Sequence, residues 1–269
     1  MRLSGRRYGF ASQWVGAEYV GEYLRSFLHD AVGGKSTVMS IDVLAVDVGK
    51  ALDSVDEWLG SYVTQPHEQL GRSGAVCPFV APARRVDAVE TAVRLVGPAA
   101  SLSLVKEVIR CGLDEFEQLE WRTSNRSLRS LLIVLPDLPP EAFGLLDEAH
   151  AQVKTESVER GLMIGQFHPE CDEPAARNPA FQVSRSPVPL VAVRAMAVHD
   201  ILFLGARADW FAQYHRRFGP RYRSRPDGIG PLLTTMYHKA LALHGPGEGP
   251  RPADTAHPGA RPRTRRDAG

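Results

Sequence analysis

Apolar residues recur at helical spacing in several parts of the chain. In residues 48–63, apolar side chains return every three or four positions, at Val48, Leu52, Val55 and Leu59. This spacing predicts an amphipathic helix that ends before the loop at residues 64–66. The same spacing predicts helices over residues 86–96, 112–121, 139–161 and 207–219.

Shorter apolar runs predict strands. Residues 130–136, SLLIVLP, are a continuous apolar run that a proline stops, as in a strand buried on both faces. Residues 162–167 and 189–198 are two further strand candidates, and residues 101–109 alternate briefly between polar and apolar positions. This mixture predicts an α+β fold, with a small mixed or antiparallel sheet and helices packed on it.

The two ends of the chain differ from this middle region. Residues 245–269 are rich in Gly, Pro and Arg and contain no large apolar side chain, which predicts a disordered tail. Residues 1–38 precede the first compact pattern and are interpreted as an N-terminal extension of uncertain order. We therefore expect a single α+β domain over residues 39–244.

Composition narrows the possible partners and location. The chain has 32 Lys and Arg against 31 Asp and Glu, a net charge of +1, so no broad field attracts nucleic acid or a membrane surface. Three widely spaced cysteines argue against a disulfide framework and for a reducing compartment. No run reaches 18 apolar residues. We expect a cytoplasmic protein with no membrane and no nucleic-acid partner.

One histidine stands at the end of a predicted strand. Pro169 cannot donate to a strand ladder and favours an extended backbone at His168, so the strand over residues 162–167 should end at the histidine. A side chain at a strand end combines rigid placement with ligand access, which suits a metal ligand or a general base. The alternative is a histidine that only stiffens the turn through a backbone hydrogen bond.

The residues that follow this histidine are polar, and their pattern fits more than one kind of site. Cys171, Asp172 and Glu173 complete the segment H-x-x-C-D-E, which has the donor types of a transition-metal site but also fits a plain polar loop. Arg177 could offer its guanidinium to a carboxylate or phosphate, or simply be solvated.

Two later features lie in or beside the last predicted strand. Arg194 stands inside an apolar run, so it either points to solvent or meets a specific anion. His199 and Asp200 are adjacent, and side chains of adjacent strand residues face opposite ways, which argues against a catalytic pair. The chain has no G-x-S-x-G elbow, G-x-G-x-x-G loop or Walker A loop.

Four segments taken in order resemble a known family. VCPF, GLMIGQFHP, RNPAF and RSPVPLVAVRAM, within residues 70–220, are similar to an uncharacterised bacterial domain-of-unknown-function family, and loosely to the YqcI/YcgG proteins. Members of the latter include heme-dependent oxygenases that hydroxylate a guanidine nitrogen of arginine-like amino acids in natural-product biosynthesis. The resemblance implies heme b and oxygen-dependent N-hydroxylation of a small amino acid or guanidine-type substrate, with a possible electron-donor protein.

This resemblance gives several residues a candidate role. Heme needs an axial imidazole or thiolate in an apolar slot and cations for its propionates. His168 is the first candidate ligand of the metal, with His199 and Cys77 as runners-up, although Cys77 also fits a small buried apolar residue. Arg177, Arg194 or Arg185 would meet the propionates.

Two alternatives from other classes stay open. The first is a non-catalytic small-anion binding or accessory protein in which Arg177 and Arg194 clamp the ligand. The second is a non-heme metal site made by His168, Cys171 and Asp172.

Overall fold

The computed structural model describes residues 41–97, 100–224 and 228–245. The predicted extension over residues 1–38 and all but the first residue of the predicted tail lie outside these ranges. Within them, none of the helices combines the length and apolar character that a transmembrane span requires. The helices are α2 (Ile41–Trp58), α3 (Val80–Arg85), α4 (Leu102–Gln118), α5 (Phe143–Glu159), α6 (Ile201–Leu204), α7 (Ala208–Ser224) and α8 (Pro231–His244).

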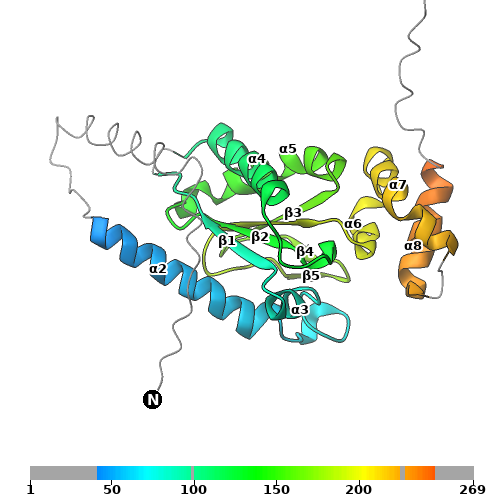
Figure 1. Cartoon of the computed structure of the whole chain (residues 1–269), viewed down its shortest axis with the longest axis horizontal. Helices are drawn as coiled ribbons and strands as arrows, with labels where there is room; N and C mark the ends of the chain where they lie inside the picture. The colour runs from blue at the N-terminus through cyan, green and yellow to red at the C-terminus, as the bar shows by residue number, and fades with distance from the viewer. Residues whose placement is uncertain (1–40, 98–99, 225–227, 246–269) are drawn as a thin grey trace, which may run out of the picture. The chain divides into compact units, whose positions relative to one another are not determined.

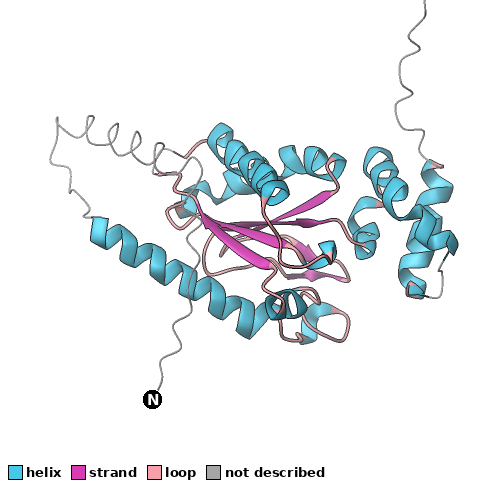
Figure 2. Ribbon diagram, viewed as in Figure 1, coloured by secondary structure: helices cyan, strands magenta, loops and turns pink. Residues whose placement is uncertain are grey.

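A four-stranded mixed sheet forms the centre of the described fold (Figures 1 and 2). Its strands follow the order β1-β2-β6-β3, which are Val89–Val93, Ser130–Val134, Leu190–Ala195 and Leu162–Phe167. Strands β1 and β2 are parallel, whereas β6 is antiparallel to both of its neighbours. A second, two-stranded sheet pairs β4 (Pro174–Ala175) with β5 (Asn178–Gln182). The α+β prediction is confirmed.

Helices α4 and α5 cover one face of the central sheet (Figure 1). Because side chains alternate along a strand, every second residue of β2 and β6, such as Leu131, Ile133 and Val193, enters this core. On the other face, Leu132, Val134 and Leu190 pack with residues from the end of α2 and from the π-helical turn η2 (Leu59–Val63). Strand β2 is therefore buried on both faces, as its unbroken apolar run predicted.

Helices α6, α7 and α8 form a further core at the C-terminal end of the domain. Its largest side chains are aromatic and include Phe211 and Tyr214 from α7 and Tyr237 from α8. Helix α7 was predicted, but α8 was not, although Leu233, Tyr237 and Ala240 repeat at helical spacing after Pro231 at the helix start.

Two segments have the opposite structure to the predicted one. Residues 86–96 were predicted as a helix, but Val89–Val93 form β1, because β-branched residues at 89, 91 and 93 also suit a strand and pair with β2. Residues 101–109 were predicted as a strand, but they begin α4. The Ser101 hydroxyl accepts a hydrogen bond from the Leu104 amide at 3.3 Å and so caps this helix.

The turn between α5 and β3 is built on glycine. Gly161 has φ 76°, a left-handed conformation that favours glycine, and it follows the last residues of α5. Its amide donates to the Val158 carbonyl at 3.0 Å, and its carbonyl accepts from the Met196 amide at 2.9 Å. This turn fixes the start of β3 at Leu162, and the strand then runs to Phe167.

Three-residue 3₁₀ turns complete the described elements. They are η3 (Glu68–Leu70), η4 (Arg126–Leu128), η5 (Pro140–Ala142) and η6 (Val198–Asp200).

Candidate functional site

Strand β3 ends immediately before His168, as the following proline predicted. The His168 carbonyl accepts hydrogen bonds from the Cys171 amide at 3.1 Å and the Ser186 amide at 3.3 Å. The backbone thus turns tightly after the strand and places Cys171 beside the histidine. Against the expectation of an open slot, however, His168 lies in the packed interior and is only 2% exposed.

Helix α5 supplies the partners of the His168 ring. Nε2 lies 3.1 and 3.2 Å from the two carboxylate oxygens of Asp147, so this nitrogen carries the proton and donates it. The ring also packs on Phe143, with 4.9 Å between the ring centroids. The other ring nitrogen, Nδ1, is buried and has no hydrogen-bond partner.

Cys171 lies beside this pair. One ligand atom from each of Asp147, His168 and Cys171 lies within 4.8 Å of the others. Burial raises the pKa of the Cys171 thiol to about 11, although a hydrogen bond from the Glu173 backbone opposes this rise. The predicted third ligand Asp172 is turned away to an exposed ion pair with Arg185 at 3.3 Å.

The residues around His168 do not fit a heme as they are placed. A heme needs a flat apolar slot against its axial nitrogen, whereas the His168 ring is enclosed by Phe143 and Asp147. Arg194, predicted to meet a propionate, pairs with Met163 in the sheet, five residues before His168. That separation is about 16 Å along the strand.

Arg194 meets a specific anion, one of the two outcomes considered from its place in an apolar strand. Its guanidinium binds both carboxylate oxygens of Asp200, at 2.8 and 2.5 Å. The Asp200 side chain is 1% exposed and also accepts from the Ala197 amide at 2.6 Å. A bidentate pair of this kind anchors the corner after β6, and it leaves Arg194 occupied.

The remaining candidate residues lie apart from His168. His199 is exposed and meets the edge of Phe79, with ring centroids 5.5 Å apart, while Arg194 lies 5.9 Å from the centroid of the same ring. Cys77 is half-buried and packs against the core on the α2 side of the sheet. Arg177 is exposed in the turn between β4 and β5. The predicted set is therefore divided among separate places.

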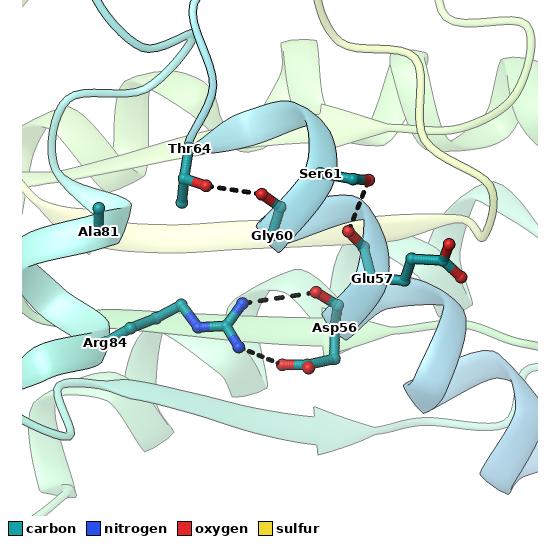
Figure 3. Close-up of a pocket in the computed structure, with 7 residues that line it drawn as sticks. All are labelled: Asp56, Glu57, Gly60, Ser61, Thr64, Ala81 and Arg84. Carbon is teal, nitrogen blue, oxygen red and sulfur yellow. Dashed lines mark hydrogen bonds and ion pairs between the residues drawn. The ribbon is translucent and has the colours of Figure 1, made fainter.

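Two hollows stand out among the described residues, and His168 lines neither. The first, of about 610 Å³, lies between the end of α2 with η2 and helix α3 (Figure 3). Asp56 and Glu57 line it together with Arg84, and Arg84 binds the Asp56 carboxylate at 2.7 Å. Its charged groups largely neutralise one another.

The second hollow, of about 290 Å³, lies between α7 and α8. The rings of Tyr222 and Tyr237 stack at 3.8 Å with an angle of 7°, and the Tyr237 hydroxyl lies 2.8 Å from His215 Nδ1. The residues lining the hollow are His215, Tyr222, Arg223, Tyr237, His238 and Leu241. Its polar groups are thus basic or hydroxylic.

Neither Asp147 nor the lining of this second hollow was predicted from the sequence. Asp147 is one of several acids on α5 and carries no local signal, since only packing against β3 brings it to His168. His215 lies in the predicted part of α7, whereas Tyr222 lies beyond the predicted end at residue 219 and Tyr237 lies on α8. The helical spacing around Tyr237 was a usable signal for this hollow.

Comparison with known proteins identifies one family. The model of a domain of unknown function, DUF6875, matches residues 52–227, which include Asp147, His168 and Cys171. Neither a curated protein nor a solved structure gives a significant match. The matched region covers most of the described fold, from α2 through α7, and more than half of the chain. The chain therefore belongs to the DUF6875 family.

Proposed function

We propose that this protein binds a small organic anion with a planar group, without catalysis, in the hollow between α7 and α8. The observation that carries the proposal is the lining of this hollow, which contains Arg223, His215 and His238 but no carboxylate. Basic side chains gathered at a concave surface favour carboxylate or phosphate ligands. A clamp made by Arg177 and Arg194 is not proposed, because Arg194 already binds Asp200.

The protonation states of Tyr237 and His215 support a role for His215 as a hydrogen-bond donor to the ligand. Burial raises the pKa of Tyr237, whereas burial and the nearby Arg223 charge lower the pKa of His215. The Tyr237 hydroxyl therefore donates to Nδ1 of a neutral imidazole, and the His215 proton resides on Nε2. Nε2 is then a neutral donor beside the Arg223 cation.

The size and walls of the hollow set the class of ligand. Its volume of about 290 Å³ is at the lower end for small-molecule sites. Leu241 adds an apolar side chain to the lining, whereas the two tyrosine rings stack on each other and are largely buried. An aromatic carboxylate or a ligand of similar size fits these features better than a nucleotide does. The α2–α3 hollow is less suited to an anion, because two carboxylates line it.

The experiment is calorimetric titration of the full chain with benzoate, phenyl phosphate and the neutral analogue benzamide. We expect both anions to bind and benzamide to bind at least about tenfold more weakly, since a charged hydrogen bond contributes roughly 1.5–3 kcal/mol. Arg223→Gln should weaken the anions to a similar degree. Arg221→Gln, an exposed change on the same helix outside the lining, is the matched control. Equal affinities for benzoate and benzamide, or equal losses in the two variants, would contradict the proposal.

A further inference from the structure

We propose that His168 and Cys171, oriented by Asp147, form a binding site for one divalent transition-metal ion, with Zn²⁺ as the best fit. This site is separate from the α7–α8 hollow, and it does not depend on the proposed ligand. Among the described residues, these three side chains are the cluster in which imidazole, thiol and carboxylate groups converge.

The spacing of the donor atoms suits a single small ion. One ligand atom of each residue lies within 4.8 Å of the others. Bonds of about 2.0–2.3 Å to Zn²⁺ place neighbouring ligand atoms roughly 3–4 Å apart. The cluster is therefore of a size that one ion can occupy, with His168 and Cys171 as its ligands and Asp147 as the acceptor of the His168 Nε2 proton.

A second observation, independent of the donor-atom spacing, supports a metal ion: His168 Nδ1 has no hydrogen-bond partner within the described ranges. A buried polar atom without a partner destabilises a fold by roughly 1–3 kcal/mol, and such atoms are rare in native proteins. His168 Nδ1 is such an atom, and because Nε2 holds the proton, Nδ1 carries a free lone pair. A metal-bound histidine commonly donates its other ring nitrogen to a carboxylate in this way. Asp147 acts as that carboxylate.

The surroundings favour a cation. Three carboxylates, those of Asp147, Glu173 and Asp172, lie near the Cys171 sulfur. Two cations lie close to these carboxylates. Lys154 interacts with the Glu173 charge, and the Arg185 guanidinium is directed to the Cys171 carbonyl and the Asp172 carboxylate. The three carboxylates thus outnumber these two cations.

The site is rigid and has one route of access. The hydrogen bond between the Cys171 amide and the His168 carbonyl fixes the two ligands on one turn, and helix α5 holds Asp147 against it. His168 and Cys171 are buried, whereas the Asp147 side chain is 43% exposed. An ion can enter from the Asp147 side, where water can complete its coordination. Two protein ligands leave the remaining coordination positions to water, which makes this an open metal site and not a closed one.

The test uses the full, tag-free chain after treatment with a chelator. Zn²⁺ is titrated in competition with a chromophoric chelator, and Co²⁺ is added in a parallel experiment because a cobalt–thiolate bond gives a near-ultraviolet charge-transfer band. We expect one Zn²⁺ per chain, a rise in melting temperature with Zn²⁺, and a cobalt–thiolate band. Cys171→Ser should abolish the band, and Asp147→Asn should weaken Zn²⁺ binding by about 10–100-fold, as loss of an orienting carboxylate does.

A double variant keeps the proposal testable if Cys171→Ser fails to fold. Cys77→Ser with Cys111→Ser leaves Cys171 as the sole thiol of the chain. The cobalt–thiolate band must persist in this protein if Cys171 is the ligand. Absence of the band in the folded wild type, its loss in the double variant, or its persistence in folded Cys171→Ser would overturn the proposal.

Discussion

At the scale of single residues, α5 places two basic side chains on one backbone carbonyl. Ile164 lies on the edge strand β3, and its carbonyl accepts hydrogen bonds from His150 Nε2 at 3.1 Å and from Lys154 Nζ at 2.7 Å. Burial and the Lys154 charge lower the pKa of His150 to about 4, and burial with the Arg194 charge lowers the pKa of Lys154 to about 8. The folded state therefore resists protonation of His150.

This resistance predicts a loss of stability in mild acid. An unfolded histidine titrates near pH 6.5, so between about pH 6.5 and 4 the unfolded chain binds one proton more than the folded chain at this position. The contribution is fully present above pH 6.5 and falls as the pH is lowered toward 4, by about 2–3 kcal/mol in total. His150→Gln keeps a donor for the Ile164 carbonyl but removes the titration.

Urea unfolding of the wild type and His150→Gln at pH 7 and pH 4.5 measures this effect. The comparison cancels the titration of the other acids. We expect the wild type to lose more unfolding free energy than the variant on acidification. An equal loss in both proteins would show that His150 protonates freely in the folded state.

At the scale of elements, α4 and β2 approach each other closely at a glycine. A Cβ atom at Gly112 would lie 2.0 Å from Ile133 Cδ1, in the core between α4 and the sheet. The apolar pattern of α4 does not reveal this contact, since it depends on which strand lies below the helix. Ser101 caps the start of the same helix, although a strand was predicted over residues 101–109.

Gly112→Ala should therefore destabilise the domain, despite the better helix propensity of alanine. Overpacking a dense core costs about 1–3 kcal/mol, which exceeds the gain of up to about 1 kcal/mol from replacing a helical glycine. Gly144→Ala in α5 is the matched control, because nothing lies within 4 Å of its added Cβ. Thermal denaturation should show a lower melting temperature for Gly112→Ala and an unchanged or higher one for Gly144→Ala. The reverse order would contradict the packing described for α4.

At the scale of the whole molecule, the family match and the two proposed sites coincide only in part. The DUF6875 model ends at residue 227, so α8 and with it one wall of the α7–α8 hollow lie beyond the match. Asp147, His168 and Cys171 all lie within it. The metal proposal thus concerns the family domain itself, whereas the anion proposal concerns this chain.

The resemblance of CPF and FHP implies heme-dependent N-hydroxylation, which spectroscopy tests directly. Because the His168 ring is enclosed and Arg194 lies far along the sheet, we expect no Soret band in protein from cells fed a heme precursor, or after reconstitution. A Soret band that His168→Ala removes would reverse this expectation and show that the packing around α5 opens to admit a heme.

The sequence alone determined the features that depend on local patterns. These patterns each involve only a few neighbouring residues. They are the apolar run of β2, the proline after the end of β3, the glycine after α5 and the helical spacing of α5 and α7. The mixed sheet with packed helices follows from their order. The secondary structure of residues 86–96 and 101–109 was predicted wrongly, because short apolar patterns fit both a helix and a strand. Pairing with β2 makes the first segment a strand, and the Ser101 cap makes the second a helix.

Only the tertiary structure decided which side chains meet. His168 and Cys171 are close in sequence, but Asp147 reaches them through the packing of α5 on β3, and Asp200 reaches Arg194 through the corner after β6. Such contacts depend on the register between elements and on burial. The spacing of residues along one segment does not encode the register or the burial. Both arise only when segments that are distant in the sequence pack together and exclude water.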